Sequence, residues 1–237
     1  QSRVINSLRA IGYYFSSVDT KIKKNDNNTV DLIYNVNLGE KAQIKKIKFI
    51  GKKVFKDNKL RKVIVSEEAK FWKFISTKKN IDIQRFKLDE NLLKNFYKNN
   101  GYYNVKILNS FAELDGEGGS FKLTFNIAAG EKYYFNNFDL ILPVDYDKKD
   151  FEDINKIFNS LKNEQYSLDN INLILNEIDE IASLKLYEFI KIDVEETVID
   201  NDKINYNFLV QDSEKFYVEK INIFGNFNTI EEVIRNK

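Results

Sequence analysis

The chain has 237 residues, and its 37 Lys and Arg side chains nearly cancel its 36 Asp and Glu side chains, leaving a formal net charge of +1. This balance argues against a nucleic-acid-binding protein, which would need a basic excess on one face. Cysteine and histidine are absent, which excludes disulfides and thiolate metal sites and removes the commonest general base and thiol nucleophile. We therefore predict no enzymatic activity, no cofactor and no bound metal.

Residues 1–37 have the pattern of the end of a module. Apolar residues from Val4 to Ile11 recur at helical spacing, and Gly12 follows as a helix terminator. Two strand-like runs, residues 13–24 and 29–36, flank an Asn-rich turn. Because the chain begins within this helical pattern and stops a few residues into another, we interpret it as a piece of a longer protein.

Residues 38–129 contain one complete set of elements. Residues 42–50 alternate between polar and apolar side chains and are followed by Gly51, which predicts a strand. We expect Asp57 to cap a short helix and Asp82 to cap a long helix that ends at Gly101. Residues 102–114 and 121–127 have the pattern of a hairpin. The predicted order is strand, helix, helix, strand, strand.

Residues 130–212 repeat this order. A strand at residues 133–142 ends at Pro143, and we expect Asp147 and Ser167 to cap the two helices that follow. Strands are predicted at residues 186–198 and 203–210. The final stretch, residues 213–237, begins a further copy, with a strand that ends at Gly225.

Each copy begins after a similar turn, at Gly39-Glu40-Lys41, Gly130-Glu131-Lys132 and Ser213-Glu214-Lys215. These turns recur at intervals of about 90 and about 80 residues, as in a tandem repeat. We therefore divide the chain into residues 1–37, 38–129, 130–212 and 213–237. Each complete copy has its own apolar helix stripes and alternating strands, so we expect independent units with hinges at residues 38–41, 129–132 and 212–215.

The repeated unit resembles a POTRA domain. The resemblance lies in the strand ends Ile47-Lys48-Phe49-Ile50-Gly51 and Ile221-Asn222-Ile223-Phe224-Gly225, the helix start Phe55-Lys56-Asp57-Asn58-Lys59-Leu60 and the junction Phe96-Tyr97-Lys98-Asn99-Asn100-Gly101-Tyr102. With the aromatic insertion at residues 68–74, the chain is similar to the POTRA arrays of BamA-type outer-membrane protein assembly factors. The middle copy departs from the pattern, since Leu142-Pro143 stands where the strand-end glycine is expected.

This resemblance implies an α+β fold of tandem modules, each β-α-α-β-β with a three-stranded mixed sheet packed on two helices. It implies the end of a second POTRA module, a complete third and fourth, and the start of a fifth. It also implies a periplasmic scaffold at the bacterial outer membrane that docks accessory lipoproteins and guides nascent outer-membrane proteins. The chain's own C-terminal transmembrane barrel would be a further partner, absent here, and nucleic acid would not be one. A POTRA array of another outer-membrane barrel, such as a polypeptide-secretion transporter, is the alternative.

The resemblance further implies that the second strand of each module lies at a sheet edge, where unpaired backbone groups can accept a partner's strand by β-augmentation. In the first complete module, alternation predicts Leu108 on the solvent side with Lys106 and Ser110. Leu108 would then seat a partner side chain. The alternative is an edge shielded by twist and charge. The candidate partner-binding residues are Val105, Lys106, Ile107, Leu108, Asn109 and Ser110.

A second candidate is the aromatic loop of Phe71, Trp72 and Phe74, which lie among lysines. Its rings would either fold back over the helices or contact a partner protein or a membrane surface. Three glycines are predicted to be structural, namely Gly51, Gly101 and Gly225. We expect Gly101 to adopt a left-handed conformation just past its helix.

Overall fold

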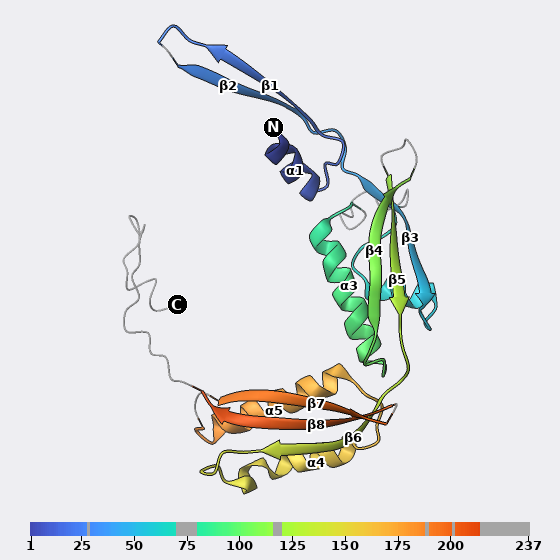
Figure 1. Cartoon of the computed structure of the whole chain (residues 1–237), viewed down its shortest axis with the longest axis vertical. Helices are drawn as coiled ribbons and strands as arrows, with labels where there is room; N and C mark the ends of the chain where they lie inside the picture. The colour runs from blue at the N-terminus through green and yellow to red at the C-terminus, as the bar shows by residue number, and fades with distance from the viewer. Residues whose placement is uncertain (28, 70–79, 116–119, 188–189, 201, 214–237) are drawn as a thin grey trace.

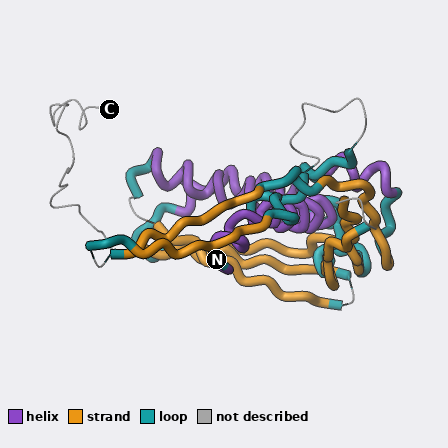
Figure 2. The backbone as a smooth tube through the Cα atoms, turned by 90° about the horizontal axis from the view of Figure 1, so that it is seen from above, coloured by secondary structure: helices purple, strands orange, loops and turns teal. Residues whose placement is uncertain are grey.

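The computed structural model describes the chain except for residues 28, 70–79, 116–119, 188–189, 201 and 214–237. Figure 1 shows the described elements following one another along an open curve, with a helix and hairpin first and two α/β modules after them. Figure 2 shows the same path from above. We define the first module as the elements from β3 to β5 and the second module as those from β6 to β8.

The N-terminal segment is a helix followed by a hairpin. Helix α1 (Ser2–Ala10) precedes β1 (Ser17–Lys24) and β2 (Val30–Asn37), which pair antiparallel. These elements overlap the predicted ranges, although α1 begins at Ser2 and β2 ends at Asn37, each slightly outside its range. Every residue of β2 is exposed, so within the described residues this hairpin has little core of its own.

The first module has the order β-α-α-β-β. Its elements are β3 (Gln43–Lys52), α2 (Asp57–Val63), α3 (Ile83–Lys98), β4 (Lys106–Leu114) and β5 (Ser120–Ala128). The strand order is β3-β5-β4, with β5 parallel to β3 and antiparallel to β4. This mixed sheet follows from the helical crossover that joins β3 to β4 and the short hairpin that joins β4 to β5.

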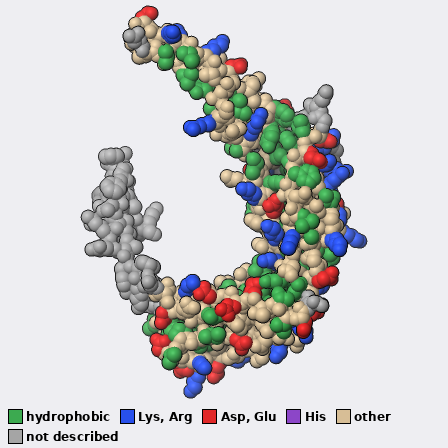
Figure 3. Space-filling model, viewed as in Figure 1, with side chains coloured by type: hydrophobic (Ala, Val, Ile, Leu, Met, Phe, Trp, Pro, Cys, Tyr) green, Lys and Arg blue, Asp and Glu red, His purple; other side chains and the backbone are tan. Residues whose placement is uncertain are grey.

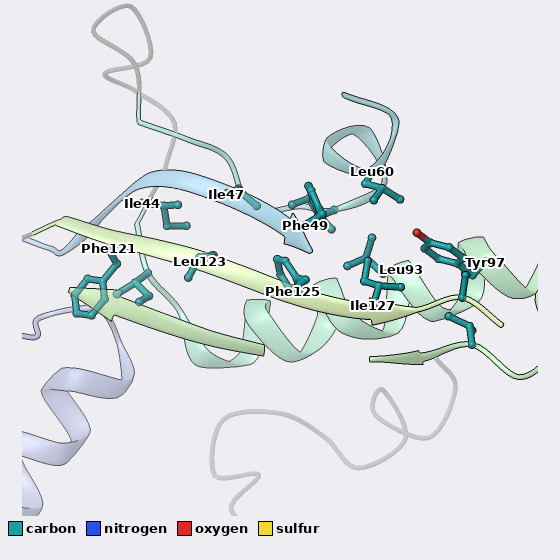
Figure 4. Packing of buried hydrophobic residues seen from close by; sticks show 14 of the residues in the cluster. Ile44, Ile47, Phe49, Leu60, Leu93, Tyr97, Phe121, Leu123, Phe125 and Ile127 are labelled. Atoms are coloured by element: carbon teal, nitrogen blue, oxygen red, sulfur yellow. The ribbon is translucent and has the colours of Figure 1, made fainter. Parts of the chain in front are cut away.

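The core of the first module lies between one face of its sheet and the two helices (Figure 4). Alternate residues of β5 point to the helices because side chains alternate across a strand, and they are Phe121, Leu123, Phe125 and Ile127. Leu93 and Tyr97, one helical turn apart on α3, are fully buried against them. Burial of each such side chain stabilises the fold by about 1.5–3 kcal/mol.

The second module repeats this architecture around a separate core. Its elements are β6 (Tyr134–Ile141), the 3-10 helix η2 (Lys148–Phe151), α4 (Glu152–Leu161), α5 (Leu168–Leu184), β7 (Ile190–Ile199) and β8 (Lys203–Asp212). The strand order is β6-β8-β7, again with parallel and antiparallel neighbours. The predicted α+β class, with a three-stranded mixed sheet in each module, is confirmed.

The helix caps agree with the sequence at Asp82 and differ at Asp57. The Asp82 carboxylate accepts hydrogen bonds from the backbone N–H groups of Gln84 and Arg85, as an N-cap should. Asp57 is instead the first residue of α2, and its carboxylate pairs with Lys53. The predicted cap at Asp57 is therefore wrong, because a cationic side chain competes for its carboxylate.

The cap predicted at Ser167 is also wrong. Ser167 is the residue before α5, but its side chain makes no capping hydrogen bond. The cap comes from the first module, where the Asn99 side-chain oxygen accepts a hydrogen bond of 2.9 Å from the backbone N–H of Asp169. The Asn99 amide also donates to the Asp169 carboxylate at 2.7 Å. The end of α3 thus caps the start of α5.

Further contacts cross the junction between the modules. The Gly101 carbonyl accepts a hydrogen bond of 2.9 Å from the backbone N–H of Tyr133. The Tyr103 ring lies 5.4 Å from the Tyr133 ring and 5.2 Å from that of Tyr166. The Tyr103 hydroxyl donates to Glu196, and burial together with this bond raises the pKa of Tyr103. These contacts cross the junction at residues 129–132, where the hinge stays a prediction.

The junction at residues 38–41 has the same backbone contact. There the Gly12 carbonyl accepts a hydrogen bond of 2.9 Å from the backbone N–H of Ala42. The Tyr14 ring packs edge-on against Phe121 of the first module, with 4.9 Å between ring centroids. The hinge predicted here also stays a prediction, and the junction predicted at residues 212–215 extends outside the described residues.

We expect Asn99→Ala to destabilise the second module by about 1 kcal/mol, the usual cost of losing an N-cap. Chemical denaturation would measure the loss. Ser167→Ala is the matched control, because it alters the conventional cap position without removing the observed cap. A larger loss in Ser167→Ala than in Asn99→Ala would contradict the cap that the first module supplies.

Candidate functional site

The sheet of the first module has two edge strands, and described residues cover the edge of β3. The Ile44 carbonyl accepts a hydrogen bond from the backbone N–H of Ala69 at 2.7 Å. The backbone N–H of Ile47 donates to the Glu68 side chain at 2.9 Å, and the Ile47 carbonyl accepts from Arg61 at 2.8 Å. The edge of β3 therefore has few backbone groups left for a partner.

The edge of β4 is open by comparison. Its backbone pairs with β5 on one side, and no described residue makes a backbone hydrogen bond to its other side. Such a row of unpaired N–H and C=O groups is a template for a strand from another chain. The resemblance to POTRA domains predicts this position for the strand.

A β-bulge interrupts β4 at Leu108. Ile107 pairs with Ile127 and Asn109 with Asn126, so Leu108 has no opposite residue. Its side chain is 60% exposed. A bulge bends the edge strand and increases its twist, so it re-aims the side chains that follow.

The bulge corrects the predicted alternation beyond Leu108. Ser110 faces the helices, where its hydroxyl donates to Glu90 of α3. Asn109 shares the solvent face instead, because it pairs with Asn126 on that face of β5. The next solvent-facing residue is Phe111, which is 36% exposed and which the sequence reasoning missed. The extra residue shifts the strand by one position and so exchanges its two faces.

The remaining candidate residues of this strand divide between core and surface. Val105 is 8% exposed and belongs to the hydrophobic core, and Ile107 is half-buried against it. Lys106 is exposed. Of the six candidates, Lys106, Leu108 and Asn109 can therefore present side chains to a partner, whereas Val105, Ile107 and Ser110 support the strand from behind.

The other candidate residues differ in what the structure describes. Phe71, Trp72 and Phe74 lie outside the described residues, as does Gly225. Gly51 has a φ of 86° and Gly101 a φ of 89°, both in the left-handed region that favours glycine. Gly101 follows the C-cap of α3, and a Cβ there would lie 2.7 Å from Gln165 of the second module.

The second sheet has one covered and one open edge in the corresponding places. On β6, the backbone N–H of Phe135 donates to the Glu164 carbonyl, and the Phe135 carbonyl accepts from Asn163, each at 2.9 Å. Among the described residues, β7 has β8 as its strand neighbour and no backbone partner on its other side. An open second strand is therefore a shared feature of the two modules.

Comparison with known proteins agrees with this architecture. A family model described as POTRA, surface antigen variable number repeat, matches residues 42–130. Residues 42–130 therefore match a POTRA domain. The matched residues correspond closely to the first module, and the second module has the same order of elements and the same sheet.

Curated relatives extend the likeness beyond one POTRA domain. The chain is 24% identical to the outer membrane protein assembly factor BamA of Neisseria meningitidis over 93% of its own length and 28% of the relative. It is 28% identical to BamA of Buchnera aphidicola over 92% of its own length and 36% of the relative. The chain thus spans about a third of these relatives, or less.

A solved structure of POTRA domains has a similar fold. The crystal structure of Haemophilus influenzae BamA POTRA3-5 matches with a TM-score of 0.55 and 15% identity, covering 89% of this chain and 80% of that one. POTRA domains of this kind are not catalytic, in agreement with the prediction that the chain is not an enzyme. In the part of the chain that the structure describes, no helix is long and apolar enough to cross a membrane.

Proposed function

We propose that this POTRA array is a periplasmic scaffold in the assembly of outer-membrane β-barrel proteins, and that β4 is a docking edge. An extended segment of a partner would pair with the free backbone of β4. Main-chain hydrogen bonds would supply the affinity, and pockets for alternate side chains would supply modest selectivity. Such a mode suits a site that must accept many different strands.

The open edge of β4 is the observation that carries this proposal. Described residues cover the edge of β3 at Ile44 and Ile47, whereas β4 has free backbone groups and a bulge. Leu108 and Phe111 place exposed apolar side chains beside these groups. The alternative is an edge shielded by twist and charge, to which the bulge at Leu108 and the charged Lys106 and Glu113 would contribute.

The likeness to BamA supports the proposed setting. We propose that residues 1–37, 38–129, 130–212 and 213–237 correspond to the end of a second POTRA domain, a third, a fourth and the start of a fifth. The partners would be accessory lipoproteins and nascent outer-membrane proteins at the periplasmic face of the outer membrane. A transmembrane barrel of the same protein would anchor the array there.

Leu108→Pro tests the docking edge, because proline removes a backbone donor without adding charge. We expect it to weaken binding of a synthetic peptide with the sequence of a β-barrel strand by tenfold or more. Leu108→Ala keeps the backbone N–H and should weaken binding by less than threefold. A fluorescence titration measures both.

Proline also affects packing and the unfolded state, so circular dichroism must first show that both variants fold. Leu108 has no opposite residue on β5, which makes this position a favourable one for proline. Equal affinity of the parent and both variants would eliminate β4 as the docking edge. The aromatic loop of Phe71, Trp72 and Phe74 would then be the next site to test.

A further inference from the structure

The net charge of +1 conceals a strong separation of charge between the two modules. Residues 38–129 contain 20 basic and 10 acidic side chains, a net charge of +10, whereas residues 130–212 contain 8 basic and 19 acidic ones, a net charge of −11. Opposite fields on neighbouring modules favour different partners for each, because complementary charge steers association and selects partners.

Three of the basic side chains of the first module lie in a line along β3, on the sheet. Lys46 pairs across the sheet with Lys122, Lys48 with Thr124 and Lys52 with Ala128. Lys46 and Lys48 alternate with the buried Ile47 and Phe49, so their side chains point away from the helices, and Lys52 follows at the exposed end of the strand. We call Lys46, Lys48 and Lys52 the β3 lysine strip. Figure 3 shows Lys and Arg side chains along the outer border of this module.

Acidic residues neutralise the neighbouring lysines but leave the strip unpaired. Glu113 of β4 forms an ion pair of 2.6 Å with Lys122, and this contact raises the pKa of Lys122. Asp115 pairs with Lys45 at 2.8 Å, which lowers the pKa of Asp115. None of the three strip lysines forms an ion pair with a carboxylate that the structure describes. The three strip lysines therefore keep their positive charge on one strand, in a row that an extended segment can follow.

The spacing of the strip suits an extended segment. At about 3.3 Å per residue, Lys46 and Lys48 are about 7 Å apart along the strand, and the strip spans about 20 Å. Lys52 and Lys106 also lie in one row of the sheet, each opposite Ala128. The small Ala128 side chain leaves the space between these two ammonium groups open to a carboxylate.

The corresponding face of the second module has a mixed charge, with Lys191 and Lys203 beside Asp139, Asp193 and Glu195. Asp139 of β6 pairs with Asn207 of β8, and Glu195 of β7 pairs with the same Asn207. Asp139 follows the buried Phe138 as Lys48 follows the buried Ile47, so one carboxylate stands where the strip has one of its lysines. The lysine strip is therefore a property of the first module and is no general feature of the fold.

We propose that the β3 lysine strip binds an extended acidic segment of a partner protein. Carboxylates at alternate positions of such a segment repeat about every 7 Å, which matches the lysine spacing. The exposed Ile50, between Lys48 and Lys52 on the same face, would contact an apolar residue of the segment. This site lies on the solvent face and is independent of backbone pairing at β4.

A protein segment fits this surface better than an anionic membrane does. A planar membrane surface would meet the acidic second module as well, and the contacts of Asn99, Tyr103 and Tyr133 hold the two modules together. Glu113 and Asp115 also border the basic surface on the β4 side, which leaves a narrow strip. Asp115 also lies near Lys46, which contributes to lowering the pKa of Asp115, so the strip meets a carboxylate at its Lys46 end.

The test uses the whole chain and an acetylated twelve-residue peptide of alternating Glu and Thr, with the corresponding Lys–Thr peptide as a reference. Fluorescence anisotropy at low ionic strength measures affinity. We expect the triple variant Lys46→Glu, Lys48→Glu, Lys52→Glu to bind the acidic peptide at least tenfold more weakly than the parent. A variant with Gln at the same three positions removes the charge without reversing it and is less disruptive to folding. It should show an intermediate loss of affinity.

The matched control carries the same charge change at exposed lysines of the first module outside its sheet, Lys56→Glu, Lys62→Glu and Lys87→Glu. The affinity of this control variant for the acidic peptide should fall by less than threefold. Leu108→Pro should leave that affinity unchanged. Equal losses in the strip and control variants would overturn the proposal in favour of net charge alone. Strip-dependent binding to vesicles with 30% phosphatidylglycerol, without peptide binding, would overturn it in favour of a membrane.

Discussion

Replacing Gly51 by alanine is expected to lower the free energy of unfolding of the first module by about 2 kcal/mol or more. Gly51 has a φ of 86°, which strains any residue with a side chain. A Cβ there would also collide with the Ile127 carbonyl and lie 2.6 Å from the Asn126 side-chain oxygen. Backbone of the central strand cannot move aside cheaply, so β3 and β5 would have to separate.

Gly39→Ala is the matched control for this prediction. Gly39 has a φ of 63°, but the nearest atom to a Cβ there would be the Phe15 carbonyl oxygen at 3.9 Å. Its substitution should therefore cost about 1 kcal/mol from backbone strain alone. Thermal and chemical denaturation measure both variants. Equal losses would mean that the close approach of β3 to β5 at Gly51 adds nothing to stability.

Phe135→Ala should destabilise the second module by about 3–5 kcal/mol, the usual cost of removing a large aromatic side chain from a core. Phe135 is fully buried, and its ring packs within 5.0 Å of Phe138 and 5.8 Å of Tyr206. The neighbouring Tyr134 points to the solvent face, so Tyr134→Ala should cost less than about 1 kcal/mol.

The separate cores give this prediction a further consequence. The residues around Phe135 belong to one hydrophobic cluster, and those around Phe125 belong to another. In Phe135→Ala, amide hydrogen exchange measured at increasing denaturant concentration should therefore show that the second module opens first, while the amides of β3 and β5 stay protected. A uniform loss of protection across both modules would indicate one cooperative unit.

Most of the fold could be predicted from periodicity and end signals. Alternation in β5 and β8 and the helical stripes of α3 and α5 identified the elements, because one buried face dictates each pattern. Asp82 was identifiable as a cap because its partner N–H groups follow it directly in sequence. The resemblance to POTRA domains then supplied the sheet order, which local pattern alone does not determine.

What could not be predicted depends on residues far apart in sequence. The bulge at Leu108 exchanges the faces of Asn109 and Ser110. The sequence of β4 alone shows regular alternation and does not reveal the bulge, because the pairing with β5 sets the register of the strand. Asn99 reads as an ordinary helix end, and its capping partner Asp169 lies in another module. The junction sequences likewise do not reveal the rings that pack across them, such as Tyr103 against Tyr133.

Hydrogen exchange of the β4 amides tests the central claim most directly. The whole chain is compared alone and with a saturating β-barrel strand peptide, and exchange is followed residue by residue. The open edge predicts that the bound peptide slows amide exchange in β4 around Leu108. Exchange in β3 should not change, because Ala69, Glu68 and Arg61 already cover its edge. Saturated binding with slowed exchange confined to β3 or the helices, and none in β4, would contradict docking at this edge.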